Sequence, residues 1–311
     1  MAVVWQISVL HLNKRTLLSG VLLMEKPFTY DKKISSFKNL LKVVKSYHID
    51  VCSHHEITVS IDHRNFETHT DEHGSFSLSL DFIPKGKPKI SLTQTNQDLQ
   101  IIQTYPIIFK DTDSSFDVIS DIDDTIVYSY TASFFKRIGT IAFTTPKKRK
   151  PIEFTQGLFD IFNEQNSRVI YISKSESNLF NILTTIIEHN NLPKGQLFLT
   201  PYLKFAQLFK SKKHNFKEVN IRFILENSGD KKFVLFGDDS QKDMEVYTSI
   251  INKFPNRLLK VYIRQTKRKI LPHQKNMLEK LRSTGVAVDY FKANKKIDVV
   301  NELTQLKNSI K

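Results

Sequence analysis

Three aspartates, Asp121, Asp123 and Asp124, directly follow the apolar stretch FDVIS at 116–120. Carboxylates beside a buried strand cost free energy unless they are paired, protonated or bound to a cation. Side chains two positions apart can point into one crevice where a chain leaves a strand, so Asp121 and Asp123 are candidates to share a divalent metal ion, and hard oxygen ligands suit Mg²⁺. The pattern D-x-D-x-T, completed by Thr125, is short and also arises by chance, so a solvated turn is the alternative. Asp124 is expected to be a surface or capping carboxylate.

Further polar residues stand where other predicted elements end or begin. The strand RVIYIS ends in Ser173, whose hydroxyl could donate to a phosphoryl oxygen, and a helix beginning near HNFKEV carries Lys217 in its first turn. The strand KFVLFG is followed by Asp238, and Asp243 stands five residues later. The alternatives are helix N-caps for Ser173 and Asp238, and an exposed lysine on a basic face for Lys217.

The elements that must position these residues form two patterns. Residues 1–110 contain short alternating strands such as EITVSID and SFSLSLDF, separated by turns, which predict a small all-β sandwich domain. Residues 111–311 alternate apolar strands with helix-length amphipathic segments, which predict an α/β domain with a parallel sheet and helices on both faces. In such sheets chemistry gathers beyond the carboxyl ends of the strands.

The ordered set D-x-D-x-T, Ser, Lys and G-D-x-x-x-x-D resembles the four motifs of the haloacid dehalogenase superfamily of phosphohydrolases. The segments SDIDDTI, YISKS, LPKGQLFL, FVLFGDDSQKD and FPNRLLKVYIR are similar to the catalytic domain of the actin-patch-type phosphatidate phosphatases, over roughly residues 110–270. The turn TDEHGSF is similar to one in the β domain that precedes this domain in bacterial relatives. The chain departs from the family pattern at residues 175–177, Thr200 and Asp239, which bear on head-group and lipid specificity.

This resemblance implies a haloacid-dehalogenase-like Rossmannoid fold and an active site with two overlapping sets of residues. The implied catalytic residues are Asp121, Asp123, Thr125, Ser173 and Lys217, and the implied magnesium ligands are Asp121, Asp123, Asp238 and Asp243. In that scheme Asp121 is the nucleophile that becomes an aspartyl phosphate, and Asp123 is the general acid and base. Ser173 and Lys217 hold the phosphoryl oxygens, and Thr125 braces the loop.

The function implied by the resemblance is Mg²⁺-dependent hydrolysis of phosphatidate to diacylglycerol and phosphate. Two alternatives stay open: a phosphatase for a soluble or nucleic-acid phosphomonoester, and a non-catalytic basic module that binds lipid or polyanions. The intact aspartates weigh against the second, because a retired enzyme would be free to lose them.

The composition bounds the partners and the compartment. The net charge of +14 favours anionic partners, and an insert near 130–152 combines basic and aromatic residues that suit peripheral contact with an anionic membrane or closure over the site. The alternative for this insert is a basic surface loop, and no nucleic-acid partner is expected. A single cysteine, Cys52, and a strand-like start without signal-peptide features favour a cytoplasmic location.

Overall fold

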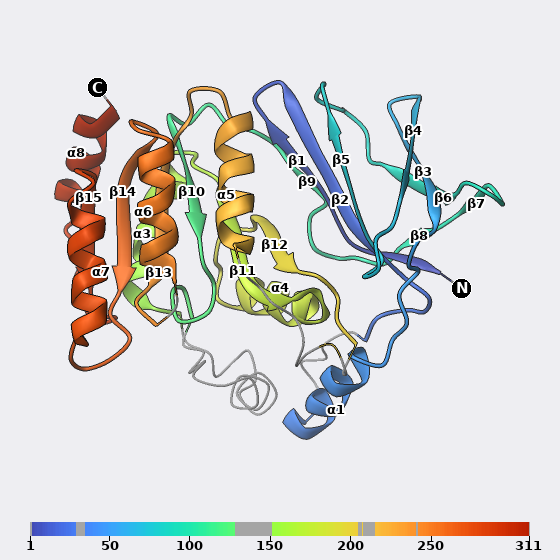
Figure 1. Cartoon of the computed structure of the whole chain (residues 1–311), viewed down its shortest axis with the longest axis horizontal. Helices are drawn as coiled ribbons and strands as arrows, with labels where there is room; N and C mark the ends of the chain where they lie inside the picture. Colours follow the sequence, from blue (N-terminus) through green and yellow to red (C-terminus); the bar gives the residue numbers. More distant parts are fainter. Residues whose placement is uncertain are drawn as a thin grey trace. The chain divides into compact units, whose positions relative to one another are not determined.

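A computed structural model describes residues 2–28, 35–127, 151–204, 207, 215–240 and 242–310 (Figure 1). The insert predicted near 130–152 lies outside these residues except for its last two positions. The chain forms two compact units. The first comprises Met1–Asp111, Ser175–Thr185 and Leu199–Lys213, and the second comprises Thr112–Lys174, Ile186–Phe198 and His214–Lys311.

The first unit is built on two β-sheets. One has the strand order β5 (Ser75–Leu80), β2 (Arg15–Leu23), β1 (Val3–Leu12) and β8 (Gln100–Ile101), with β9 (Ile108–Phe109) also paired to β1. The other has the order β4 (Arg64–His69), β3 (Glu56–Ile61), β6 (Lys89–Leu92) and β7 (Gln97–Asp98). Alternate residues of β3 and β5 are buried, as the period of two predicted, and both sheets contribute to one hydrophobic core. The prediction of β-sheets in this part of the chain is confirmed.

The first unit also contains a helix that the all-β prediction missed. Helix α1 (Ser36–Ser46) begins after Ser35, whose side chain accepts a hydrogen bond from the Lys38 amide at 3.4 Å. A serine at this position satisfies one of the free amides of the first helical turn. The apolar residues of α1 follow a helical spacing rather than a period of two, and that spacing was available in the sequence.

The second unit is built on a six-stranded sheet. Its order is β12 (Gln196–Thr200), β11 (Val169–Glu176), β10 (Phe116–Ser120), β13 (Lys232–Asp238), β14 (Leu258–Arg264) and β15 (Ala287–Phe291). The pairs β10–β11, β10–β13, β13–β14 and β14–β15 are parallel, which confirms the parallel sheet predicted from the alternation. After β10 the chain adds β11 and β12 on one side and returns to add β13 on the other, so the strand order reverses at β10. Parallel α/β sheets bind ligands at such a reversal.

Helices pack on both faces of this sheet. The helices that lie wholly in this unit are α3 (Glu153–Glu164), α5 (Phe216–Asn227), α6 (Asp243–Lys253), α7 (Pro272–Arg282) and α8 (Val299–Ile310), whereas α4 (Phe180–His189) has residues in both units. The Phe159 ring of α3 packs edge-on against Phe236 of β13 at 5.2 Å between centroids, whereas the adjacent Gly237 faces Tyr247 of α6. Because neighbouring residues of a strand face opposite sides, α3 and α6 cover opposite faces. None of the helices in the described part of the chain is long and apolar enough to cross a membrane.

Candidate active site

The register of the parallel sheet brings three of the predicted residues to one edge. Ser120, the last residue of β10, pairs with Tyr171 of β11 and with Phe236 of β13. Asp121, Ser173 and Asp238 therefore all follow this row within two residues. Strand β11 continues to Glu176, so Ser173 lies inside the strand and not at its end as the sequence predicted. Ser173 is buried.

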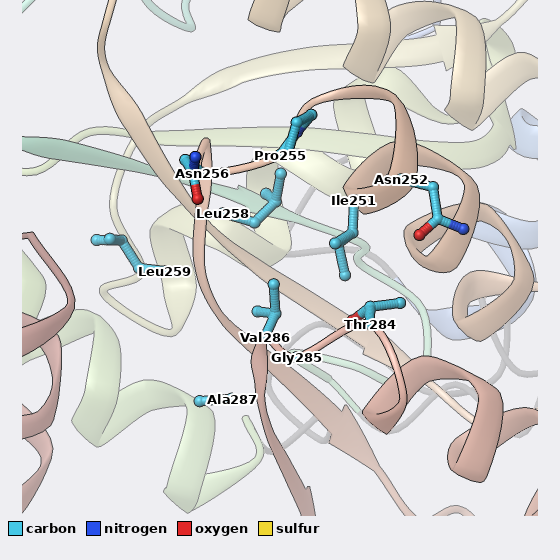
Figure 2. A pocket seen from close by; sticks show the side chains of 10 residues that line it. All are labelled: Ile251, Asn252, Pro255, Asn256, Leu258, Leu259, Thr284, Gly285, Val286 and Ala287. Carbon is cyan, nitrogen blue, oxygen red and sulfur yellow. The ribbon is translucent and has the colours of Figure 1, made fainter.

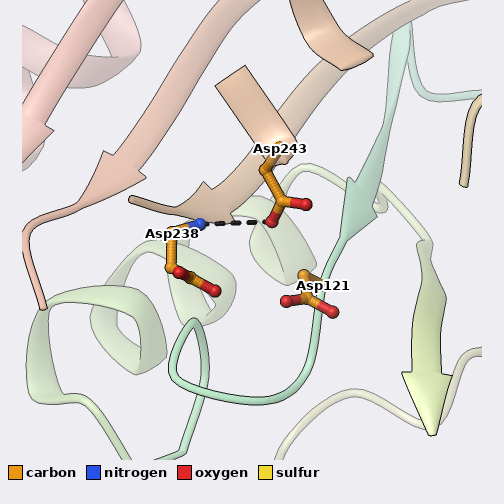
Figure 3. A group of neighbouring side chains, drawn as sticks. All are labelled: Asp121, Asp238 and Asp243. Atoms are coloured by element: carbon orange, nitrogen blue, oxygen red, sulfur yellow. Dashed lines mark hydrogen bonds between the residues drawn. The ribbon is translucent and has the colours of Figure 1, made fainter. Parts of the chain in front are cut away.

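Three carboxylates gather at this edge: Asp121 after β10, Asp238 at the end of β13 and Asp243 at the start of α6 (Figure 3). Each offers an oxygen, and these oxygens all lie within 4.8 Å of one another. All three side chains are buried. The Asp238 amide donates to Asp243 Oδ2 at 3.3 Å, which joins the strand end to the helix start. Gly237 permits this approach, because a Cβ there would lie 2.7 Å from Asp243 Oδ2.

Lys217 supplies the buried cation of the cluster. It is the second residue of α5 and is only 2% exposed, so it is not the surface lysine that was its alternative. Its Nζ lies 2.5 Å from Asp243 Oδ1 and 3.1 Å from Asp121 Oδ2. Burial by itself lowers the pKa of Lys217, but the carboxylates of Asp121 and Asp243 outweigh it and hold this pKa above its ordinary value.

The cluster contains three carboxyl groups and one ammonium group, and the pKa values of two of the carboxyl groups, Asp121 and Asp238, are raised. Burial raises the pKa of Asp121 well above its ordinary range; the Lys217 ammonium opposes this rise, and Asp243 and Asp238 add to it. Burial, reinforced by the Asp243 carboxylate, raises the pKa of Asp238 to about 7. A divalent cation bound beside these two carboxyl groups would stabilise their charged forms and so lower their raised pKa values.

The residues present fit a magnesium ion. Asp121 Oδ1 and Asp238 Oδ2 are buried and accept no hydrogen bond from any described residue. Buried oxygens are normally satisfied, so two such oxygens in one carboxylate cluster indicate a ligand that accepts their lone pairs. Three carboxylates match the hard-oxygen preference of Mg²⁺. The Asp123 side chain does not belong to this three-residue group, although its charge contributes to the raised pKa of Asp121.

A tight turn carries Asp123 and Thr125. The amides of Thr125 and Ile126 donate to the Ile122 carbonyl at 3.3 and 3.1 Å, and Asp123 is buried within the turn. The Thr125 carbonyl accepts from the Thr155 hydroxyl of α3 at 3.0 Å, which ties the turn to a covering helix. The Thr125 hydroxyl is buried and makes no hydrogen bond to the described residues. The alternative of a solvated turn is therefore ruled out for this segment.

Asp124 does not lie on the surface as expected. It is buried and has a left-handed φ of 57°, and its carbonyl accepts from Arg264 Nη1 at 2.6 Å while its carboxylate oxygen lies 3.3 Å from the same atom. Aspartate is among the few residues that tolerate this φ. Arg264 is the last residue of β14, and its contacts with Asp124 hold the turn that follows Asp121 in place.

Two other residues lie near the cluster, and the sequence predicted no catalytic or metal-binding role for either of them. Asp239 is buried and accepts from the Thr266 amide at 2.9 Å and from the Tyr290 hydroxyl at 2.5 Å, which fixes the backbone directly after Asp238. Lys174 follows Ser173, and its pKa is lowered by burial and by the charge of Lys217. Lys174 directly follows the predicted Ser173 in the sequence, which was the signal that could have found it, whereas Asp239 was noted only as a departure from the family pattern.

A separate cavity of about 510 Å³ lies at the other end of the sheet (Figure 2). It is lined at the end of α6 and the starts of β14 and β15 by residues such as Ile251, Leu258 and Val286. None of its lining residues is ionisable, so it offers no acid, base or metal ligand.

Comparison with known proteins identifies the same region. Residues 116–265 match the family model for the catalytic domain of phosphatidate phosphatase APP1. The matched segment contains every residue of the carboxylate cluster, Lys217 and Arg264. The match supports a phosphatase enzyme.

Two curated proteins are similar to the chain. The chain is 29% identical over 215 residues to phosphatidate phosphatase APP1 of Saccharomyces cerevisiae, covering 65% of this chain and 35% of that protein. It is 24% identical over 178 residues to the uncharacterized protein C29B5.04c of Schizosaccharomyces pombe, covering 56% of this chain and 29% of that protein. The chain thus spans about a third or less of the length of these relatives.

Among solved structures, a class C acid phosphatase from Bacillus anthracis with tungstate bound shares 12% identity, with a TM-score of 0.35 over 63% of this chain and 79% of that one. A likeness at this TM-score does not establish a shared fold.

Proposed function

We propose that this chain is a Mg²⁺-dependent phosphatase of the haloacid dehalogenase type. The observation that carries the proposal is the buried cluster of Asp121, Asp238, Asp243 and Lys217 within the segment that matches a phosphatase catalytic domain. A solvated structural turn would not bury three carboxylates around one ammonium, since burial without a ligand is costly. An anionic phosphoryl group together with a divalent cation is the ligand pair that balances this charge pattern.

Phosphatidate is the substrate that we propose, with diacylglycerol and phosphate as the products. The proposal rests on the family model and on the similarity to a named phosphatidate phosphatase. The carboxylate cluster and Lys217 would contact only the phosphoryl group, which lipid and soluble phosphomonoesters share. A soluble phosphomonoester is therefore the outcome against which the lipid substrate must be tested.

In the proposed reaction an Asp121 carboxylate oxygen attacks the phosphorus atom, and the bond from phosphorus to the alcohol oxygen breaks. Asp123 donates a proton to the departing alkoxide, and then accepts one from the water that attacks the aspartyl phosphate, which releases inorganic phosphate and restores Asp121. Proton transfer of this kind contributes about 10²–10⁴-fold to the rate. Lys217 and Ser173 orient the phosphoryl oxygens.

Asp121, Asp238 and Asp243 would hold the magnesium ion through their carboxylates, and Asp123 would complete the set that the resemblance implies through its main-chain carbonyl. When bound, the ion supplies positive charge that lets an anionic nucleophile approach an anionic substrate. Asp243 also forms an ion pair with Lys217, so the position of this lysine, which would bind the phosphate, is linked to the metal ligands.

The experiment that tests this function measures phosphate release from phosphatidate in mixed micelles, with Mg²⁺ or with a chelator. It compares the wild type with Asp121→Asn, which keeps the size of the side chain and removes the nucleophile. We expect release only from the wild type with Mg²⁺. Asp160→Asn, at an exposed position of α3, is the matched control and should match the wild type.

The outcomes separate the alternatives. Metal-dependent release from a small aryl phosphate without release from phosphatidate would retain the chemistry and discard the lipid substrate. Release that persists in Asp121→Asn would contradict the assigned nucleophile. No release from either substrate would favour the non-catalytic binding module.

A further inference from the structure

Exposed apolar side chains concentrate in one short segment of the first unit. The large apolar residues that are exposed in the described chain are Met24, Phe28, Phe37, Leu41, Ile83, Val219 and Val300. Four of these seven lie within residues 24–41, in and just before helix α1. Single exposed apolar residues are normal on a protein surface, but a contiguous group indicates an interaction site.

Helix α1 places two of them on one face beside positive charge. Phe37 is 60% exposed and Leu41 is 45% exposed. They are separated by four residues, so they lie one above the other on the helix surface. The helix also carries Lys38, Lys42 and Lys45 and has no acidic residue. At about 100° per residue the three lysines fall in one sector that adjoins the Phe37–Leu41 face.

Helix α1, which exposes Phe37 and Leu41, is itself packed against the rest of the first unit. Val43, Tyr47 and Ile49 are buried, which fixes the opposite side of α1 and the residues directly after it. The Ser46 carbonyl at the end of the helix accepts hydrogen bonds from Asn178 Nδ2 at 3.3 Å and from the Tyr202 hydroxyl. Both donors belong to the same compact unit as α1. The side chains of Phe37 and Leu41 on helix α1 (labelled in Figure 1) are thus exposed, while hydrogen bonds hold the end of the helix in place.

We propose that the Phe37–Leu41 face of α1 docks on the surface of an anionic membrane. A helix with an exposed apolar face and adjoining lysines lies in the plane of a lipid interface, with the apolar side chains inserted and the lysines at the head groups. The charge of the helix selects anionic lipid, and the net charge of +14 acts in the same direction. The surface is distinct from the carboxylate cluster, and the inference does not depend on which phosphate ester is hydrolysed.

The test is flotation of the full chain with vesicles that contain no phosphatidate, so the outcome is separate from that of the phosphatase assay. One set is phosphatidylcholine alone, and the other contains about one-third phosphatidylserine, which supplies the negative surface potential. The wild type is expected to float with the second set and to be released by salt. The double substitution Phe37→Ser with Leu41→Ser is expected to weaken binding at least about tenfold, because two apolar side chains no longer insert.

Matched variants and a positive signal separate docking from a folding defect. Val300→Ser removes an exposed apolar residue of α8 and should leave vesicle binding unchanged. Lys38→Glu with Lys45→Glu should abolish the preference for anionic vesicles, whereas Lys280→Glu on the exposed surface of α7 should lower it far less. Phe37→Trp should show a blue-shifted emission on adding anionic vesicles, over the constant background of the buried Trp5.

Three results would overturn the proposal. The wild type could fail to bind anionic vesicles, or the serine double variant could bind as the wild type does while melting at the same temperature. The Phe37–Leu41 face could instead mediate self-association, seen as a concentration-dependent dimer in sedimentation velocity that the serine variant loses.

Discussion

At the scale of single residues, the candidate site is a balance of buried charges. Lys217 contacts Asp121 and Asp243 directly, and Asp238 reaches Asp243 through its backbone amide. Removing one member would leave an uncompensated buried charge, which is more damaging than the loss of the pair's own attraction. The protonation of Asp121 and Asp238 should therefore affect both stability and the proposed binding of a metal ion.

The raised pKa of Asp238 predicts how magnesium binding depends on pH. Mg²⁺ requires the deprotonated carboxylate, and the pKa of Asp238 is about 7 in the metal-free protein. The apparent affinity for Mg²⁺ should rise as pH increases and level off above this pKa. Below the pKa the Asp238 carboxyl group is protonated, and it must lose its proton before the ion can bind. The check is titration calorimetry with Mg²⁺ at several pH values, on wild type and Asp238→Asn. Affinity that does not change across this pH range in the wild type would contradict the prediction.

The same raised pKa fixes the sign of the pH effect on metal-free stability. A carboxyl group whose pKa is higher in the folded than in the unfolded protein stabilises the fold at low pH, and this contribution is lost as pH rises through the folded value of about 7. Mg²⁺ should oppose that loss by binding the charged form.

Arg264 is a positioning residue whose substitution should lower activity without removing any reacting group. It holds the Asp124 carbonyl and carboxylate at a residue with positive φ, so it shapes the turn that carries Asp121. Arg264→Lys keeps the charge and loses the planar fork, and we expect kcat to fall about tenfold or more through misplaced reacting groups. The measurement is kcat and KM with a soluble aryl phosphate, with the exposed Arg282→Lys as control. A change confined to KM would argue against positioning of the nucleophile.

At the scale of elements, the close approach of β13 and α6 sets the geometry of the proposed metal site. Asp238 ends the strand, Asp243 begins the helix, and Gly237 leaves the space between them. Because the helix start delivers one carboxylate and the strand end the other, the distance between these two elements decides whether both can reach one cation.

Gly237→Ala should disturb this contact. The added Cβ would lie 2.7 Å from Asp243 Oδ2 and 2.9 Å from the Tyr247 ring, so α6 must shift. We expect a loss of about 1–3 kcal/mol in unfolding free energy, typical of overpacking, and weaker Mg²⁺ binding. Gly157→Ala is the control, because its Cβ meets only the terminal methyl of Ile297 and alanine favours a helix. Denaturant unfolding and calorimetry provide the measurements, and equal effects of the two substitutions would contradict the argument.

At the scale of the whole molecule, the chain does not divide into units at a single point. The first unit takes in Ser175–Thr185 and Leu199–Lys213 as well as the N-terminal residues. Within that unit, the Trp5 ring contacts Phe180 edge-on at 5.2 Å, and Tyr202 donates to Ser46. Residues that follow two strands of the second unit therefore complete the packing of the first.

Because the first unit is built from three segments of the chain, we expect residues 1–111 to be less stable alone than in the whole chain. The fragment would lack Phe180 and Tyr202, and would expose the apolar surface that they cover. Amide protons of β1 and of the α1 end should exchange faster in the fragment, as measured by hydrogen exchange with mass spectrometry. Equal protection in the fragment and the whole chain would show that the added segments are dispensable.

The sequence alone predicted the parallel sheet of the second unit, the β-sheets of the first and the residues from which the candidate site is built. It did so because strands, turns and the spacing of D-x-D-x-T are local patterns that neighbouring residues determine. The same local reasoning missed α1, whose helical spacing lies among strands, and placed Asp124 on the surface.

The tertiary structure decided the features that depend on residues far apart in the chain. It placed Lys217 between Asp121 and Asp243, joined Asp124 to Arg264 across 140 positions, and drew residues after Ser175 into the first unit. Burial and the resulting pKa shifts of Asp121 and Asp238 follow from that packing. The physical reason is that a charge's free energy depends on every group within a few ångströms, and folding alone decides which groups those are.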